Sequence, residues 1–128
     1  MRGGLVIGIV DDDESCRESL QALLGACDCD VQLFRSAEEF LASSEWLRCD
    51  CLLVDATLPG KSGPELQALL RARNSTIPLV FVTGSEDAEL RQVVLAAGAI
   101  DCLCKPFEEE ELFISLGKAI AARVALRI

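Results

Sequence analysis

The stretch Cys51-Leu52-Leu53-Val54-Asp55-Ala56-Thr57-Leu58-Pro59-Gly60 decides the fold of this 128-residue chain. Its apolar run is typical of a parallel β-strand that is buried on both faces, and the Pro/Gly pair after it predicts a turn. Asp55 is therefore expected at the carboxyl edge of a sheet, where α/β proteins bind ligands. The alternative is an Asp that only caps the turn, and the rest of the chain has to decide between the two.

Strands and helices are predicted to alternate along the whole chain. Short apolar runs indicate strands at residues 5–10, 31–34, 51–55, 79–83 and 101–104. Apolar residues at helical spacing follow each run, and this alternation implies a parallel sheet covered by helices on both faces. The predicted fold class is therefore α/β, a doubly wound (βα)5 unit with a five-stranded parallel sheet. The chain is expected to be one domain over residues 1–122, with residues 123–128 as a tail or the start of a linker.

Local signals place several of the helices more closely. Ser36-Ala37-Glu38-Glu39 has the capping-box pattern, in which a Ser hydroxyl accepts from a helix amide and a Glu reaches back. A later helix is predicted over residues 86–97, with Gly98 as its left-handed cap. Acidic residues from Glu108 onward favour the start of the last helix. The apolar face of that helix is predicted to contain Phe113, Leu116, Ile120 and Val124.

Composition and charge exclude several classes of function. With a net charge of -9, the chain has no basic surface for phosphate backbones, so no direct nucleic acid binding is expected. No apolar stretch reaches the roughly 18 residues that a membrane span needs, and the first residues lack the pattern of a signal peptide. We therefore expect a cytoplasmic protein without a membrane segment.

Seven cysteines in a chain without a targeting segment are expected to be reduced thiols. Three pairs have Cys-x-Cys spacing: Cys27 and Cys29, Cys49 and Cys51, and Cys102 and Cys104. In a strand this spacing puts both side chains on one face, where Cys commonly serves as a small buried hydrophobe. A zinc site is the weaker interpretation, because zinc sites usually have wider Cys spacings and the chain contains no His.

The predicted strand ends carry groups that suit phosphoryl chemistry. Asp11 and Asp12 follow the first strand, Asp55 ends the third, Thr83 ends the fourth, and Lys105 follows the fifth. Carboxylates gathered at one edge repel one another unless a cation neutralises them, and Mg²⁺ prefers such oxygen ligands. Thr83 and Lys105 are suited to hold the oxygens of a phosphoryl group on Asp55. Each residue alone has a simpler role, and their joint placement at four strand ends favours the site.

The chain resembles the receiver domains of two-component response regulators from Val6 to about Ile120. The resemblance rests on five stretches: Ile9-Val10-Asp11-Asp12-Asp13, Leu53-Val54-Asp55-Ala56-Thr57-Leu58-Pro59-Gly60-Lys61-Ser62-Gly63, Val82-Thr83-Gly84, Ala97-Gly98-Ala99 and Cys104-Lys105-Pro106-Phe107. The stretch Ser36-Ala37-Glu38-Glu39-Phe40-Leu41 further resembles the FixJ-like branch, whose receivers usually precede a helix-turn-helix domain. The resemblance implies a flavodoxin-like, CheY-like fold with strand order 2-1-3-4-5.

The resemblance also implies a function. Asp55 would accept a phosphoryl group from a partner histidine kinase, and Thr83 and Lys105 would contact the phosphoryl oxygens. Lys105-Pro106 would form a cis peptide bond. The chain would then be a signalling phosphoacceptor and not an enzyme in the usual sense. Mg²⁺ would be held by Asp11, Asp12, Asp55 and the backbone carbonyl of Thr57.

The residues expected to transmit the signal match the family pattern less well than the residues of the site do. In the family, an aromatic residue three positions before the Lys commonly rotates inward on phosphorylation, but this chain has Cys102 there and contains no Tyr. We therefore expect a surface of the fourth helix, fifth strand and fifth helix, a possible homodimer contact on phosphorylation, to respond without an aromatic switch. The output is expected to be a transcription-regulating domain or partner. The alternative is a receiver of a hybrid histidine kinase, or a stand-alone regulator that acts through protein contacts.

Three rival functions share parts of this pattern. A haloacid dehalogenase-type phosphatase needs a second Asp two residues after its nucleophile, and this chain has Thr57 there. A flavodoxin-like nucleotide binder needs a first loop that accepts phosphate, whereas Asp11-Asp12-Asp13-Glu14 would repel it. A non-phosphorylated interaction module would be expected to lack part of the acidic site.

Overall fold

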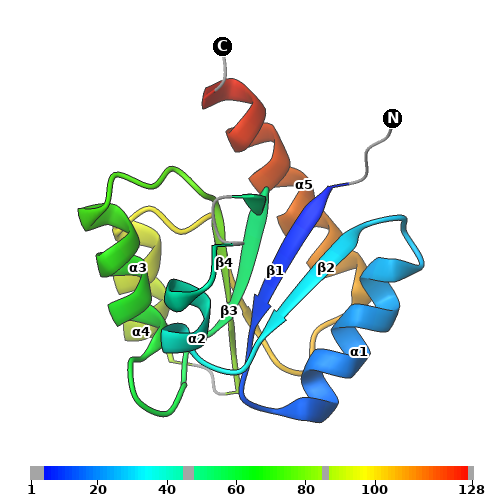
Figure 1. Ribbon diagram of the computed structural model, residues 1–128, viewed down its shortest axis with the longest axis horizontal. Helices are drawn as coiled ribbons and strands as arrows, with labels where there is room; N and C mark the ends of the chain where they lie inside the picture. Colours follow the sequence, from blue (N-terminus) through cyan, green and yellow to red (C-terminus); the bar gives the residue numbers. More distant parts are fainter. Residues whose placement is uncertain (1–4, 45–47, 85–86, 127–128) are drawn as a thin grey trace.

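The computed structural model describes residues 5–44, 48–84 and 87–126, and strands alternate with helices along them as predicted (Figure 1). The strands are β1 (Val6–Val10), β2 (Asp30–Phe34), β3 (Cys51–Asp55), β4 (Leu79–Thr83) and β5 (Asp101–Cys104). The helices are α1 (Glu14–Gly25), α2 (Ala37–Ala42), α3 (Gly63–Ala72), α4 (Ala88–Ala96) and α5 (Glu109–Leu126). The strand bounds differ from the prediction by one residue at the starts of β1 and β2.

The strands form one parallel sheet in the order β2-β1-β3-β4-β5, which confirms the predicted order. β3 lies at its centre, and its last residue, Asp55, is paired with Val82 of β4. Thr83, the next residue of β4, is paired with Cys104 of β5. Because all strands run the same way, their carboxyl ends meet at one edge of the sheet, and Asp55 lies in the middle of it.

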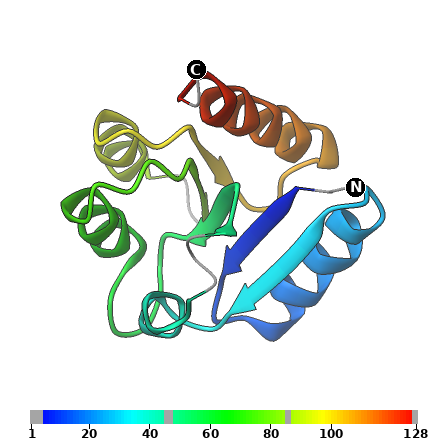
Figure 2. The same ribbon diagram turned by 45° about the horizontal axis from the view of Figure 1, so that its top comes forward.

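Both faces of the sheet are covered by helices, because the side chains of a buried strand alternate between its faces. In β3, Leu52 and Val54 belong to the core beneath α2, α3 and α4, whereas Cys51 and Leu53 belong to the core beneath α1 and α5. Figures 1 and 2 show these two groups of helices on opposite sides of the sheet. The central strand is therefore held from both sides, and its end is a rigid support.

Four helices begin at side-chain caps, at the edge where the strands end. The capping oxygens accept hydrogen bonds from amides of the first turn: Asp13 from Ser15 and Cys16, Ser36 from Glu39, Ser62 from Glu65, and Asp87 from Leu90. Such caps satisfy helix amides that have no partner within the helix.

The predicted ends of α2 and α4 agree with the structure in part. Ser36 caps α2 as predicted, but the Glu39 carboxylate accepts from the Arg35 amide, so the complete capping box lies instead at Ser62 and Glu65 of α3. The predicted start of α4 at Glu86 lies outside the described residues. Gly98, with φ of 107°, follows the end of α4 as the predicted left-handed residue.

The buried face of α5 differs from the predicted one. Leu116 is buried and Phe113 and Ile120 are half-buried, but Val124 is 51% exposed. The buried positions are instead Leu112, Ser115, Leu116 and Ala119. Figure 1 shows why: the last turns of α5 project beyond the edge of the sheet, so helical spacing there has no core to face. The helix continues through Leu126, and the predicted domain end at residue 122 stays a prediction.

All seven cysteines are free thiols. Cys49 and Cys51 are buried in the cores on opposite faces of the sheet, because β3 begins only at Cys51. Cys27 and Cys29 lie between α1 and β2, where Cys27 is exposed. Cys27, Cys29 and Cys49 thus lie outside the strands, as the predicted strand bounds imply, and only Cys102 and Cys104 form a pair within one strand.

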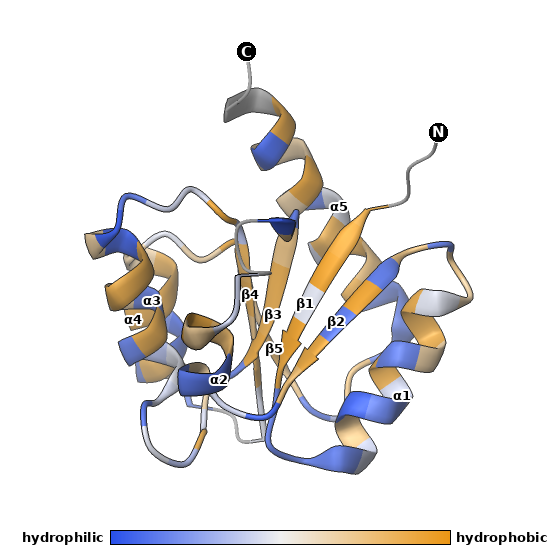
Figure 3. Ribbon diagram, viewed as in Figure 1, coloured by the Kyte–Doolittle hydropathy of each residue, from blue (hydrophilic) through white to orange (hydrophobic). Residues whose placement is uncertain are grey.

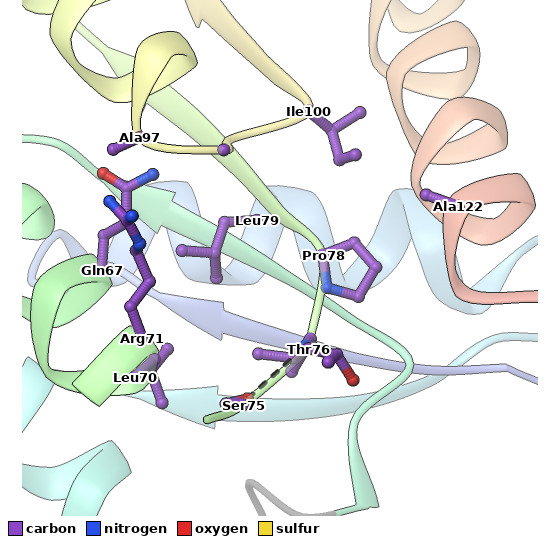
Figure 4. A pocket seen from close by; sticks show the side chains of 12 residues that line it. Gln67, Leu70, Arg71, Ser75, Thr76, Pro78, Leu79, Ala97, Ile100 and Ala122 are labelled. Carbon is purple, nitrogen blue, oxygen red and sulfur yellow. Dashed lines mark hydrogen bonds between the residues drawn. The ribbon is translucent and has the colours of Figure 1, made fainter. Parts of the chain in front are cut away.

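The opposite edge of the sheet contains a cavity of about 300 Å³ near the amino ends of β4 and β5 (Figure 4). Its lining is mainly apolar and includes Leu70, Pro78 and Ile100. Gln67 of α3 is buried there, and its Nε2 donates to the Val94 carbonyl of α4 at 3.0 Å. In the described part of the chain, no helix is both long and apolar enough to span a bilayer.

Candidate functional site

Carboxylates from two strand ends converge at the carboxyl edge. Asp11 and Asp12 follow β1, Asp55 ends β3, and one ligand oxygen of each lies within 4.8 Å of the others. Figure 3 shows the hydrophilic stretch that follows β1, directly beside the hydrophobic strands. The predicted acidic cluster therefore exists in the folded chain.

Asp11 is only 2% exposed and is fixed through both its backbone and its carboxylate. Its amide donates to the Phe34 carbonyl of β2 at 3.0 Å, and its carbonyl accepts from Arg17 Nη1 at 2.7 Å. The carboxylate accepts from the Asp13 amide at 2.9 Å through Oδ1, and its Oδ2 lies 3.4 Å from Lys105 Nζ. Contacts within the protein thus fix the orientation of this buried carboxylate before any ligand binds.

Asp55 has a carboxylate that is accessible but largely enclosed, with 11% of the side chain exposed. Its Oδ1 accepts from the Thr57 amide at 2.9 Å, and its Oδ2 lies 3.6 Å from Lys105 Nζ. Burial raises the pKa of Asp55 above its ordinary value, and the charges of Asp11 and Asp12 add to the rise. The Thr57 amide and the Lys105 ammonium oppose it without cancelling it.

Lys105 lies between the buried carboxylate of Asp11 and the half-buried carboxylate of Asp55. Burial lowers the pKa of its ammonium, but the charges of Asp11 and Asp55 outweigh burial, so the pKa is raised overall. The predicted cis peptide bond between Lys105 and Pro106 is present. The Lys105 amide also donates to the Thr83 carbonyl at 2.8 Å, which joins the ends of β4 and β5.

The other predicted residues lie at the same edge. Thr83 is buried at the end of β4, and Asp12 and Thr57 are exposed beside Asp11 and Asp55. The fold thus gathers every predicted site residue at one edge of the sheet. Their roles toward a phosphoryl group or a metal stay predictions.

The donor set fits Mg²⁺. Three carboxylates bring hard oxygen atoms of the kind that Mg²⁺ takes in proteins. Among the ion pairs of the described residues, Lys105 is the cation that contacts Asp11 and Asp55, and it supplies one positive charge to the cluster. A further cation at this edge is therefore electrostatically favourable.

Two residues next to the site were not singled out from the sequence. Burial raises the pKa of Cys16, in the first turn of α1, to about 11, and a hydrogen bond to Asp11 adds to the rise. Gly63 opens α3, where an added Cβ would lie 2.9 Å from the Asp55 carbonyl oxygen and 2.8 Å from the Phe81 ring. The sequence could have indicated that Cys16 lies near the site, because it falls in the first helical turn after Asp11 and Asp12. Nothing in the sequence reveals the close approach at Gly63.

Sequence comparisons agree with this geometry. The model of the response regulator receiver domain matches residues 7–116. The response regulator protein TmoT of Ectopseudomonas mendocina is 37% identical over 115 residues, which cover 90% of this chain and 52% of TmoT. The transcriptional regulatory protein FixJ of Bradyrhizobium diazoefficiens is 36% identical over 114 residues, which cover 89% of this chain and 56% of FixJ. The chain thus spans about half the length of these relatives.

A solved structure confirms the fold. The crystal structure of FixJ-N has a TM-score of 0.85 and 32% sequence identity, and the match covers 94% of this chain and 96% of that one. The predicted flavodoxin-like, CheY-like architecture is therefore correct. Together with the family match and the acidic edge, it establishes that this chain belongs to the response regulator receiver domains of two-component systems.

Proposed function

We propose that this chain accepts a phosphoryl group on Asp55 from a phosphohistidine of a histidine kinase. A carboxylate oxygen of Asp55 attacks the phosphorus atom and forms a new P–O bond. The P–N bond breaks, and its electron pair stays on the imidazole nitrogen. The product is an acyl phosphate. The observation that carries this proposal is the Asp55 carboxylate at the centre of the edge, 3.6 Å from Lys105 Nζ and beside two further carboxylates.

The surrounding residues assist by position and charge. Lys105 already lies within 3.6 Å of Asp55, so its ammonium is suited to contact a phosphoryl oxygen there. The hydroxyl of Thr83 is the proposed second contact. Mg²⁺, when bound, neutralises charge on the transferred group. Its proposed ligands are Asp11, Asp12, Asp55 and the carbonyl of Thr57.

Intact-mass spectrometry tests the proposal. The wild-type chain is incubated with acetyl phosphate or a phosphorylated histidine kinase, with and without Mg²⁺. We expect a gain of one phosphoryl group that requires Mg²⁺, is absent in Asp55→Asn and persists in Asp30→Asn, a control that removes an exposed charge outside the site. No gain in folded wild-type protein with Mg²⁺ bound would overturn the proposal, as would an undiminished gain in Asp55→Asn.

We further infer that the output surface of α4, β5 and α5 responds without an aromatic switch. Cys102 is buried in the core that contains Phe81. Arg91 of α4 donates to the Cys102 carbonyl and lies 3.4 Å from Asp101, and the Asp101 carboxylate accepts from Ser115 of α5 at 2.7 Å. Polar contacts thus join the two helices through β5 and supply another route for a signal.

Structures with and without beryllofluoride test this route. We expect the contacts of Arg91 and Asp101 to change while no aromatic ring moves. Phe81 is already fully buried, so a half-buried Phe107 that swings inward on activation would contradict the inference. Sedimentation with beryllofluoride tests the proposed homodimer through this surface, and a monomer that persists would count against it.

The proposed output is a transcription-regulating domain or partner. In support, FixJ is named a transcriptional regulatory protein, and this chain matches only 56% of its length. Direct DNA contact by this chain is not proposed, since its net charge is -9. The alternative is a receiver of a hybrid histidine kinase or a stand-alone regulator. Chromatin capture with the native full-length protein separates these outputs.

A further inference from the structure

Two adjacent glutamates in the first turn of α2 make different contacts. The Glu39 carboxylate accepts from the Arg35 amide at 3.2 Å, so it stays within the start of its own helix. The Glu38 carboxylate reaches away from the helix and accepts from the Lys61 amide at 3.0 Å, in the loop between β3 and α3. Figure 1 shows α2 and this loop at the same end of the sheet. Of these two glutamates, it is therefore Glu38 that connects α2 to the chain that follows Asp55.

The phosphoacceptor loop, residues 56–61, is held at both ends. Near its start, the Thr57 amide donates to the Asp55 carboxylate at 2.9 Å, and Leu58 is buried in the core. Near its end, the Lys61 amide donates to Glu38. Each end of the segment between these two amides is thus tied to a different element. Thr57, whose carbonyl is the proposed metal ligand, belongs to this restrained segment.

The carboxylate of Glu38 lies directly against the turn of the loop. Gly60 has φ of 72°, and a Cβ added there would lie 2.7 Å from Glu38 Oε2. The hydrogen bond from the Lys61 amide lowers the pKa of Glu38, and the Lys61 side-chain charge lowers it further. The acceptor is therefore charged at neutral pH, and charge-assisted hydrogen bonds are the stronger kind.

We propose that Glu38 is a positioning residue for the metal site, because it fixes the loop that presents the Thr57 carbonyl. The inference rests on the proposed function, in which that carbonyl is a ligand of Mg²⁺. When Glu38 is lost, the Lys61 amide loses its acceptor and the loop is held beyond it only by the bonds of Ser62 and Gly63, so part of its ordering has to accompany metal binding. Affinity for the metal then falls, because the binding-competent arrangement is only partly populated.

Magnesium titration calorimetry on matched variants tests the proposal. Glu38→Ala and Glu39→Ala each remove one charge from the first turn of α2, but only the first loses a contact with the loop. We expect Glu38→Ala to bind Mg²⁺ roughly three- to tenfold more weakly, as for the loss of one net hydrogen bond. Glu39→Ala should stay within about twofold of wild type. Glu38→Gln keeps a neutral acceptor and should fall between the wild type and Glu38→Ala.

A second measurement separates positioning from a general loss of stability. Because coupling between sites is reciprocal, Mg²⁺ should slow hydrogen exchange of the Lys61 amide in the wild type. In Glu38→Ala that amide should exchange faster at every Mg²⁺ concentration, while the thermal midpoints of the two Ala variants stay similar. Equal Mg²⁺ affinities for Glu38→Ala and Glu39→Ala would overturn the inference.

The outcomes distinguish this inference from the proposed function. If the wild type binds Mg²⁺ and gains a phosphoryl group but Glu38→Ala behaves identically, only the role of Glu38 is wrong. If the folded wild type binds no Mg²⁺, the proposed function fails first, and the role of Glu38 falls with it.

Discussion

The two edges of the sheet stabilise their buried polar groups in opposite ways. At the amino edge, Gln67 is neutral, and its amide is matched by the Val94 carbonyl. At the carboxyl edge, Asp11 and Asp55 share one ammonium, that of Lys105, and Asp12 adds a further negative charge. The buried amide at the amino edge has a hydrogen-bond partner and carries no charge. At the carboxyl edge, three carboxylates face one ammonium, so negative charge is in excess. The contrast separates an edge whose buried polar group has a partner from an edge whose charges are suited to a cation.

Of the changes considered, added Mg²⁺ should have the largest effect on the free energy of unfolding, and it should act at the carboxyl edge alone. At a concentration one hundred times its Kd, a ligand that binds only the folded state adds about 2.7 kcal/mol to the free energy of unfolding. We expect a gain of that size for the wild type and for Asp30→Asn, and a much smaller one for Asp55→Asn. Urea unfolding at fixed ionic strength measures it. Equal gains in all three proteins would place the cation elsewhere.

Substitution of Gly63 should have the next largest effect. In Gly63→Ala the added Cβ meets the Ala56 Cα and the Asp55 carbonyl oxygen at 2.9 Å, so the backbone has to shift. Overpacking of this kind should lower the free energy of unfolding by about 2 kcal/mol. Gly117→Ala is the control, because nothing lies within 4 Å of a Cβ there. If the two variants are equally stable in urea, the close approach beneath Asp55 is not tight.

A substitution at the amino edge should have a smaller effect, confined to stability. Gln67→Leu keeps most of the side-chain volume but removes the donor to the Val94 carbonyl, which still accepts from the Ala99 amide at 2.9 Å. We expect a loss of about 1 kcal/mol in the free energy of unfolding. Calorimetry should give an unchanged affinity for Mg²⁺. A weaker affinity would show that the two edges are coupled.

The smallest expected effect is the pH dependence from Asp55. Its pKa is raised in the folded chain, so the folded state holds this proton more tightly than the unfolded state does. The corresponding stability is present below the unfolded value of 3.8 and is lost as the pH rises through the folded pKa. Without Mg²⁺, Asp55→Asn should therefore gain on the wild type as the pH rises through this window. Urea unfolding at several pH values measures the free energy of unfolding of Asp55→Asn minus that of the wild type, and a fall of this difference with rising pH would contradict the prediction.

The strand ends could be predicted because they follow from local pattern. Apolar runs that stop at Val10, Asp55 and Thr83 mark the ends of strands. Because the strands pair in parallel, these ends lie at one edge of the sheet. The acidic cluster and Lys105 then come together without further information. The family resemblance supplied the strand order, which the alternation of strands and helices alone does not determine.

Other features depend on contacts that sequence spacing does not encode. The hydrogen bond from the Lys61 amide to Glu38 joins residues 23 apart. Its donor is a backbone amide, which nearly every residue type has, so the residue type at position 61 does not predict it. Val124 continues the helical spacing of α5, but the spacing does not reveal where the sheet beneath the helix stops. Cys49 and Cys51 have strand spacing, yet β3 begins only at Cys51, so Cys49 lies outside the strand.

The helix caps at the carboxyl edge occupy some of the amides that an incoming anion could otherwise use. Exposed amides at a helix start are a common phosphate site. Here Ser15, Glu39, Glu65 and Leu90 already donate their amides to capping side chains. In each of these four helices at least one first-turn amide is thus already bonded to its cap before a phosphoryl group arrives. In the proposed function, side chains such as Lys105 therefore take a larger share of the phosphoryl contacts, and a single substitution can remove them.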